Sequence, residues 1–506
     1  MSYNKINTTK NGQKFTPVPP QKTGVENGHL VTIRNNERYA KYWACGDLRK
    51  DFVITQHRQK IYALQGKSAK ILAPIFYEKN GIQKQTHRVV HCTHRRISAE
   101  NGVFVYVNTE TAKAQYGNLM LCGSVWTCPK CANRITTARS AEVLQAIKGA
   151  PAFGFLTLTT PHHKAMPLAY LLAMQAQAKE IFYRSHRVRR MLALLGVHGR
   201  ITATECTYGE VNGWHPHYHA LLFLDRPVSY DHVIPFMPHK IWTPAPCKNR
   251  HCFGEPAWRF DEIPNQIFFV DFVALARDEL AHQWINACHD AGMDNLPTVK
   301  HGLDLQAITD AKAMAKIADY MTKYGCMPAP TDGDGMGRIN NELTKWHSKT
   351  KVRTAGEPLT GLTPFEILSM ADTDNPNCPY SRLWIEFANA FKGKRQLDWS
   401  AKLKERYGIG EQSDDDIVNA TDEKAEQVFE ITYTVWRLIC QRNERTKPLE
   451  LAEQDYQDNG SRLYDYCIDV LIDHIEQCKV NDLTPCPYVM RDINNLLQIS
   501  PLDVAA

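Results

Sequence analysis

The 506-residue sequence lacks several features that would assign it to a class at once. It has no uninterrupted apolar run of about 18 residues, so we expect no transmembrane helix. Residues 1–28 are polar and contain no apolar segment of the kind that a secretory signal needs, so we expect the protein to stay in the cytoplasm. We find no internal repeat and no G-x-x-x-x-G-K-[ST] phosphate loop, so no ATP-driven unwinding is predicted.

A strong excess of charge of one sign is also missing. The chain carries 60 Lys and Arg against 54 Asp and Glu, a net charge of +6, which permits nucleic-acid binding without favouring it. A hydrophobic fraction of 43% with 23% charged residues excludes general disorder, collagen and a fibrous coiled coil. The length exceeds what one ordinary core accommodates, so we expect more than one domain.

Composition shifts divide the chain into four predicted regions. Residues 1–30 read as a disordered arm, and 31–150 as an N-terminal region with a Cys-rich segment at 92–131. Residues 151–330 read as an α+β domain, and 331–506 as a mainly helical C-terminal region. The α+β assignment follows from the order of predicted elements: strand 153–159, helix 166–195, strands 201–208 and 215–224, helix 272–292, strand 298–306 and helix 311–324. This order favours a mostly antiparallel sheet.

The most informative segment is a histidine-rich strand over residues 213–224. Alternation along a strand places His215, His217 and His219 on one face, a pattern typical of a metal site. Pro216 cannot donate to a strand ladder, so His215 belongs to the start of the strand and is the least secure ligand of the three. The alternative is a half-buried histidine cluster bound to backbone and water, and the three alternating residues favour metal.

The preceding strand supplies a carboxylate. If the turn is centred on Val211, Glu205 pairs directly with His217, and the small Ala203 lies opposite His219. Opposed Cβ atoms are about 4.5–5.5 Å apart, close enough for one carboxylate and two imidazoles to share a cation. A register shift of one residue would turn Glu205 to the other face.

A second candidate segment lies near the end of the helix predicted over 311–324. Tyr320, Lys323 and Tyr324 fall on one helical face. A tyrosine can act as a nucleophile when it is activated, and a neighbouring ammonium stabilises a phenolate or binds a phosphate. Tyrosine pairs at this spacing are more often packing residues, so this segment gains weight only beside the histidine strand.

The 15 cysteines include one set with metal-site spacing. Cys122, Cys128 and Cys131, with Cys92 upstream, offer four thiolates for a structural zinc ion. His94 could replace Cys92, and buried free cysteines are the alternative. A second set, Cys247, His251 and Cys252, is weaker.

Taken together, these segments resemble the rolling-circle replication initiators (Rep proteins) of plasmids and prophages, within the HUH endonuclease superfamily. Phe155-Leu-Thr-Leu-Thr159 is similar to their first motif, His217-Tyr-His219-Ala-Leu-Leu222 to the second, and Tyr320-Met-Thr-Lys323 to the third. Further similar segments are 122–131, 301–306, 342–346 and 393–400, so the resemblance covers roughly residues 92–399.

The resemblance implies an α+β nicking domain at 151–330, with a central antiparallel sheet flanked by helices as in ferredoxin or RRM folds. It implies a Mg or Mn ion held by His217, His219 and a third ligand such as Glu205, with Tyr320 as the nucleophile that forms a 5′-phosphotyrosyl link to single-stranded origin DNA. Tyr324 has the spacing of a second tyrosine found in some phage relatives. A host helicase and a host polymerase would act as partners in the bacterial cytoplasm, and no membrane is involved.

Other classes stay open at this point. A relaxase or transposase of the same superfamily has similar motifs, a zinc hydrolase would use Glu205 and the histidines, and a zinc-containing DNA-binding regulator would have no catalysis. We expect two groups of basic residues to contact DNA phosphates. The first is Arg184, Arg187, Arg189 and Arg190, and the second is Lys392, Lys394 and Arg395.

Overall fold

The computed structural model describes residues 22–26, 29–33, 46–226, 240–246, 256–262, 272–308, 359, 361–375, 377–420, 422–481 and 483–498. The chain separates into two compact units, residues 1–60 and 61–506. The first contains an antiparallel hairpin of β1 (Lys22–Glu26) and β2 (His29–Ile33). This hairpin falls mostly within the arm predicted to be disordered.

A five-stranded antiparallel sheet forms the centre of the second unit and confirms the predicted α+β class. Its spatial order is β12-β7-β9-β8-β13, so the histidine strand β9 lies in the middle. The strands are β7 (Ala152–Thr159), β8 (Val197–Gly209), β9 (Gly213–Leu224), β12 (Leu303–Ile308) and β13 (Leu397–Trp399). A short helix, α7 (Val299–Gly302), precedes β12 where the sequence predicted the start of a strand.

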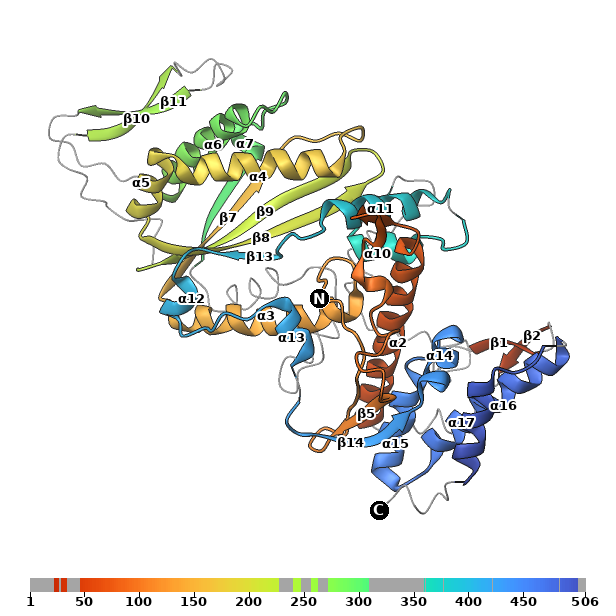
Figure 1. The fold of residues 1–506 in the computed structure, drawn as a ribbon. Helices are drawn as coiled ribbons and strands as arrows, with labels where there is room; N and C mark the ends of the chain where they lie inside the picture. Colours follow the sequence, from red (N-terminus) through yellow and green to blue (C-terminus); the bar gives the residue numbers. More distant parts are fainter. Residues whose placement is uncertain are drawn as a thin grey trace, which may run out of the picture. The chain divides into compact units, whose positions relative to one another are not determined.

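Helices cover both faces of this sheet (Figure 1). On one face lie α4 (Leu168–Arg184), α5 (His186–Leu194) and α6 (Phe272–Asp290), packed on Tyr218 and Leu222 of β9. The single helix predicted over 166–195 is divided because Ser185 has extended backbone torsions and bonds to Gln283 with its hydroxyl, at 3.3 Å.

On the opposite face lies α3 (Pro129–Gly149), packed with α12 (Leu403–Arg406) on Leu221 and Phe223 of β9. Since residues of a strand alternate between faces, His217 and His219 point to the same side as Leu221 and Phe223. The helix and the histidines therefore share one face of the sheet. The backbone of α3 begins directly after Cys128, so it also connects the Cys-rich segment to the sheet.

A second, three-stranded sheet has the order β14-β5-β6 and joins chain segments far apart in sequence. It consists of β5 (Val103–Asn108), β6 (Ala114–Gly117) and β14 (Ala425–Ile431). The C-terminal helices pack on it in a shared core. They are α14 (Tyr433–Gln441), α15 (Lys447–Asp458), α16 (Arg462–Val480) and α17 (Pro487–Gln498). The region predicted as mainly helical thus also provides a strand to each of the two sheets.

The remaining elements are short except for α2. They are α2 (Gly46–Leu72), η1 (Arg88–Val90), α10 (Pro364–Met370), α11 (Pro379–Ala390) and α13 (Asp414–Asn419), with the hairpins β3 (Phe76–Lys79) with β4 (Ile82–Gln85) and β10 (Lys240–Pro246) with β11 (Pro256–Glu262). Within the described ranges, no helix combines the length and apolarity needed to cross a bilayer.

Candidate metal centres

The register of the β8–β9 hairpin is the one predicted from its turn. Glu205 pairs with His217 and Ala203 with His219, and the connection runs between Gly209 and Gly213. The strand twist and the alternation of side chains therefore bring the carboxylate and the two imidazoles to one point on the face of the central strand.

Three ligand atoms converge at this point. Oε2 of Glu205 lies 3.1 Å from Nε2 of His217 and 3.0 Å from Nε2 of His219. The side chains are 21%, 12% and 7% exposed, so the cluster is largely shielded from bulk water and still accessible. One carboxylate oxygen and two imidazole nitrogens are a donor set that could hold a metal ion.

The second nitrogen of each ring is also engaged. Nδ1 of His217 lies 3.3 Å from the carbonyl oxygen of His215, and Nδ1 of His219 lies 3.1 Å from Oγ1 of Thr157. The carbonyl only accepts, so Nδ1 of His217 donates to it, and Nε2, which faces Glu205 in this structure, would present its lone pair to an ion that replaces that contact. Thr157 lies opposite His219 on β7. Its role was not predicted from the sequence, although Thr157 belongs to the segment that is similar to the first motif.

The electrostatics of the cluster suit a divalent cation. Burial favours the neutral form of Glu205, but hydrogen bonds from His217 and His219 outweigh it and hold the pKa of the carboxyl well below its usual range. Burial lowers the pKa of His219 against the opposing effect of Glu205, which favours the neutral imidazole that binds metals. The set therefore offers one carboxylate oxygen and two imidazole nitrogens, and the residues fit such an ion.

His215 does not belong to this cluster. The group whose ligand atoms lie within 4.8 Å of one another contains Glu205, His217 and His219. The ring of His215 instead stacks on His162 at a centroid distance of 4.4 Å. Burial, with His217 and His162 nearby, lowers the pKa of His215 to about 4.

The predicted nucleophiles Tyr320 and Tyr324, with Lys323, lie outside the described residues, as do Cys247, His251 and Cys252. The described chain before them ends with β12, which pairs with β7 beside the histidine strand. The roles of these tyrosines therefore stay predictions.

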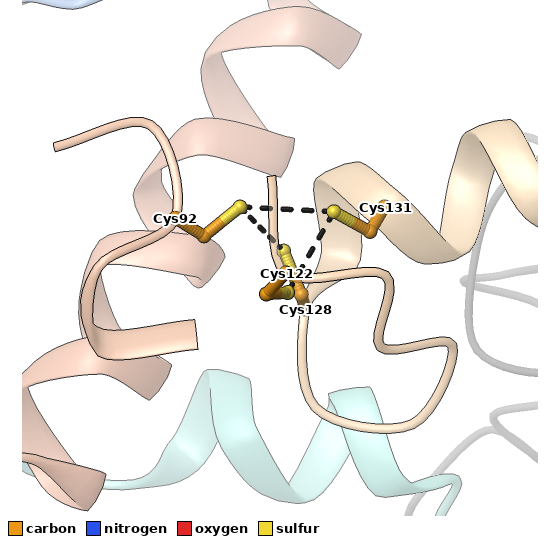
Figure 2. A group of neighbouring side chains, drawn as sticks. All are labelled: Cys92, Cys122, Cys128 and Cys131. Atoms are coloured by element: carbon orange, nitrogen blue, oxygen red, sulfur yellow. Dashed lines mark hydrogen bonds between the residues drawn. The ribbon is translucent and has the colours of Figure 1, made fainter. Parts of the chain in front are cut away.

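The four predicted cysteines form the second centre (Figure 2). Sγ of Cys92 lies 3.6 Å from Sγ of Cys131 and 3.6 Å from Sγ of Cys128, and Cys122 lies 3.6 Å from Cys131. All four are buried. Cys92 follows η1, Cys122 lies in the loop after β6, and Cys128 and Cys131 flank the first turn of α3.

These spacings fit a tetrahedral thiolate site. A zinc ion with four bonds of about 2.3 Å places its sulfurs roughly 3.8 Å apart, whereas a disulfide needs about 2.05 Å. The described cysteines are free, so no disulfide competes with this interpretation. His94 is directed elsewhere, since its Nδ1 donates to the carbonyl of Cys92 at 2.8 Å. The group could hold a metal ion, with Cys92 as the fourth ligand.

Two curated proteins are similar to this chain. The chain is 23% identical over 378 residues to "Protein rep" of Streptomyces lividans, which covers 64% of this chain and 73% of that protein. It is 28% identical over 149 residues to a "Neomycin resistance protein" of Streptomyces cyanogenus, which covers 24% of this chain and 34% of that protein. No family model and no solved structure matches.

The first of these similarities extends over most of both chains, and its name agrees with the resemblance found in the motifs. The second spans about a third of its protein, and its name points to no chemistry that the two metal centres suggest. The comparison therefore supports the assignment of the chain as a Rep-type replication protein.

Proposed function

We propose that the protein starts rolling-circle replication of a plasmid or phage by nicking and rejoining single-stranded origin DNA. The observation that carries the proposal is the Glu205–His217–His219 cluster on the central strand of an antiparallel sheet. The similarity to a protein named for replication gives this cluster its context.

The architecture supports an HUH nicking domain. The His-hydrophobic-His segment lies on the middle strand, the first motif lies on the neighbouring strand β7, and helices pack on both faces. The strand β12 leads from this sheet toward Tyr320 in the sequence, so the predicted nucleophile follows the strand next to the first motif.

The proposed reaction is a transesterification. The phenol oxygen of Tyr320 attacks the phosphorus of the scissile bond, a new P–O bond to tyrosine forms, and the bond to the 3′ oxygen breaks. The phenol proton leaves and the departing 3′ oxygen is protonated, which yields a 5′-phosphotyrosyl link and a 3′-OH for a host polymerase. A phosphodiester is exchanged for another phosphodiester, so no ATP is required.

A divalent cation such as Mg²⁺ or Mn²⁺, held by Glu205, His217 and His219, would neutralise charge on the scissile phosphate and orient it. Thr157 and the backbone of His215 keep the two imidazoles in the orientation that metal binding needs. Lys323 would bind a phosphate oxygen or stabilise the phenolate, and Tyr324 would serve as a second nucleophile for resealing.

The cysteine centre has a structural role in this proposal. Four buried thiolates without an open position suit zinc, and the centre fixes the start of α3, whose other end packs on the nicking sheet. DNA unwinding would come from a host helicase.

The test is incubation of the full-length protein with single-stranded DNA that carries the origin of its replicon, with and without Mn²⁺. We expect cleavage together with a protein–DNA adduct that survives SDS. Both should disappear with a chelator and in His217→Ala, while Phe76→Ala, an exposed residue outside the cluster, should behave as wild type.

Other outcomes identify the alternatives. Cleavage without an adduct would indicate a hydrolase that activates water. Duplex binding without cleavage, unchanged in His217→Ala, would indicate a DNA-binding regulator. Strand transfer to a second DNA molecule without initiation of replication would indicate a transposase or relaxase.

A further inference from the structure

The hairpin β3–β4 is exposed at every position except Gln85. Phe76, Tyr77 and Ile82 are 53%, 43% and 60% exposed, and the hairpin forms a two-stranded sheet of its own. Its turn, Asn80-Gly81, has positive φ at both residues, 55° and 73°, as a tight two-residue hairpin turn requires. Large apolar side chains on an isolated exposed hairpin mark an interaction surface.

The two faces of this hairpin differ in chemistry. The register pairs Tyr77 with Lys84 and Lys79 with Ile82, so alternation places these four side chains on one face. Glu78, the one acidic residue between positions 76 and 85, lies on the other face. One face therefore combines an aromatic ring with two ammonium groups.

A third ammonium belongs to this face. Nζ of Lys392, in the turn after α11, lies 4.9 Å from the ring centroid of Tyr77. Residues 392–395 are exposed and contain three cations, Lys392, Lys394 and Arg395. These are cations predicted from the sequence to contact phosphates, and Lys392 lies beside the hairpin.

Hydrogen bonds to the body of the protein hold both the β3–β4 hairpin and the turn 392–395 in place. Gln85 donates to the carbonyl oxygens of Leu72 and Ile75 at 3.0 and 3.1 Å, and His87 bonds to Asn389 of α11 at 3.0 Å. Trp126, within the cysteine loop, donates to the carbonyl of Lys394 at 2.7 Å. The aromatic ring and its cations are thus held in a fixed arrangement, which lowers the ordering cost of binding.

The basic turn continues into the sheet that holds the candidate active site. Gln396 accepts a backbone hydrogen bond from Thr204 at 3.4 Å, and Leu397 of β13 pairs with Ala203. Thr204 directly precedes Glu205. The basic turn beside Tyr77 is therefore followed directly in the chain by the edge strand β13, which pairs with the strand that carries Glu205.

We propose that the Tyr77 face of the β3–β4 hairpin, with Lys392, is a binding site for single-stranded DNA. A base stacks on Tyr77 while Lys79, Lys84 and Lys392 contact the phosphates on either side. A single strand is favoured over duplex because only an unpaired base offers its flat face to an aromatic ring, and stacking with backbone charge is how sequence-tolerant strand binding works. The choice of single-stranded DNA as the ligand rests on the proposed function. The position of the site is one that no sequence motif assigns.

The experiment measures binding of a fluorescein-labelled, mixed-sequence single-stranded oligonucleotide by anisotropy, in a His217→Ala background so that cleavage does not interfere. Tyr77→Ala should weaken binding roughly tenfold through lost stacking. Phe76→Ala is the matched control, because it removes an equally exposed aromatic from the opposite face, and it should leave affinity unchanged. Lys79→Gln with Lys84→Gln should reduce the slope of log K against log salt by about 0.7 for each lysine.

Circular dichroism and zinc content of each variant confirm that the fold is intact, which is expected because the hairpin side chains are exposed. If the wild-type protein binds and nicks single strands, equal affinity of Tyr77→Ala and Phe76→Ala in the His217→Ala background would overturn the hairpin site and leave the proposed function standing. If Tyr77→Ala weakens binding to duplex DNA but not to the single strand, the hairpin site is likewise overturned and the proposed function stands. A wild-type protein that neither binds nor nicks single strands would instead contradict the proposed function, and the hairpin site with it.

Discussion

At the scale of single residues, the metal-binding capacity of the histidine strand depends on where the ring protons are held. His217 donates its Nδ1 proton to a backbone carbonyl, which mutation does not remove. His219 has Thr157 as its Nδ1 partner, a side chain that can be changed. Replacing the Nδ1 partner can therefore test the orientation of His219, but not that of His217.

Thr157→Val keeps the volume of the side chain and removes the hydroxyl. We expect it to weaken Mn²⁺ binding at the Glu205–His217–His219 cluster by roughly tenfold, because the outer partner of a ligating histidine fixes its ring orientation. Isothermal titration with Mn²⁺ measures this directly. Thr157→Ser keeps the hydroxyl and should restore most of the affinity, whereas equal affinities for all three proteins would show that Thr157 does not orient His219.

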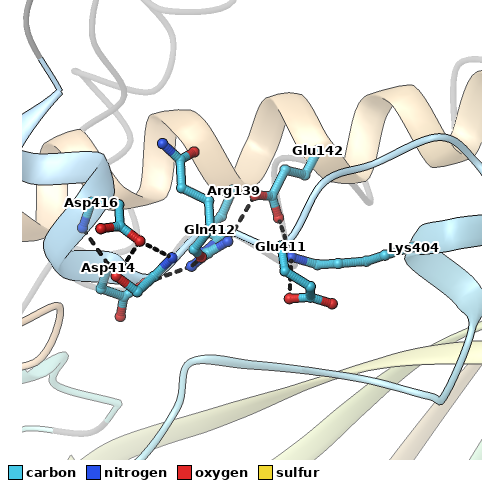
Figure 3. A network of polar contacts seen from close by, with 8 residues as sticks. Arg139, Glu142, Lys404, Glu411, Gln412, Asp414 and Asp416 are labelled. Atoms are coloured by element: carbon cyan, nitrogen blue, oxygen red, sulfur yellow. Dashed lines mark hydrogen bonds and ion pairs between the residues drawn. The ribbon is translucent and has the colours of Figure 1, made fainter.

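At the scale of elements, α3 is held between the cysteine centre and the sheet by polar contacts with the segment after β13 (Figure 3). Lys404 is only 9% exposed at its side chain and lies 3.3 Å from Glu142 of α3 and 3.4 Å from Glu411. Arg139 of α3 contacts Glu142 at 2.7 Å and Asp414 at 2.9 Å. The network fixes the segment 404–416 along this helix.

Lys404→Met should lower the free energy of unfolding by about 2 kcal/mol, since it leaves the largely buried Glu142 with Arg139 as its remaining ion-pair partner. Urea unfolding followed by circular dichroism provides the measurement. Lys148→Met removes a charge from an exposed position of the same helix and should cost less than about 0.5 kcal/mol. Similar costs for both variants would mean that the network does not stabilise the element.

The cysteine centre fixes the other end of α3. With zinc as the proposed ion of this centre, Cys128→Ser should abolish stoichiometric zinc binding and lower the melting temperature by several degrees, because only three of the four buried cysteines remain to hold the cation. Elemental analysis and thermal unfolding test this pair of effects. Cys486→Ser changes an exposed cysteine and should retain both the metal and the melting temperature. A Cys128→Ser protein that keeps one equivalent of zinc would contradict the four-thiolate site.

The local elements of the site were predictable from sequence, and the long-range ones were not. The β8–β9 register followed from one turn and the alternation of residues, both local properties. The break at Ser185 depends on a contact with Gln283 in another helix. The three-residue strand β13 pairs with residues nearly 200 positions earlier, from 397 to 203, and so short a strand has no recognisable pattern of its own. Thr157 acquires its role only when β7 is placed beside β9.

At the scale of the whole molecule, the C-terminal region completes structures that the N-terminal half begins. β14 pairs with β5, and Arg445, which is 2% exposed, donates to Thr93 at 2.6 Å and to the carbonyl of Tyr62 at 3.2 Å. Arg445 also donates to Gln65, whose amide donates to the carbonyl of Cys92 at 2.9 Å. The net charge of +6 is therefore an average over segments that are distant in the sequence and joined in the fold.

Arg445→Met should destabilise the protein by about 3 kcal/mol, because several buried acceptors lose their donor at once. It should also speed the loss of zinc to a chelator, since the Gln65 amide that donates to the Cys92 carbonyl loses the guanidinium that holds its oxygen. Denaturant unfolding and a chromogenic chelator assay measure the two effects. Arg437→Ala, at an exposed position of α14, should change neither. Unchanged zinc release in Arg445→Met would show that the C-terminal region does not support the cysteine centre.

The most direct test of the central claim, a tyrosine-linked nicking reaction, is peptide mapping of the DNA adduct. Trypsin cleaves after Lys316 and Lys323, so Tyr320 lies in the peptide 317–323 and Tyr324 in the next peptide. After nuclease trimming, mass spectrometry should find the nucleotide phosphate on 317–323 in wild type and find it absent in Tyr320→Phe. A Tyr320→Phe protein that forms the adduct at wild-type yield, or a modification on neither peptide, would contradict the account.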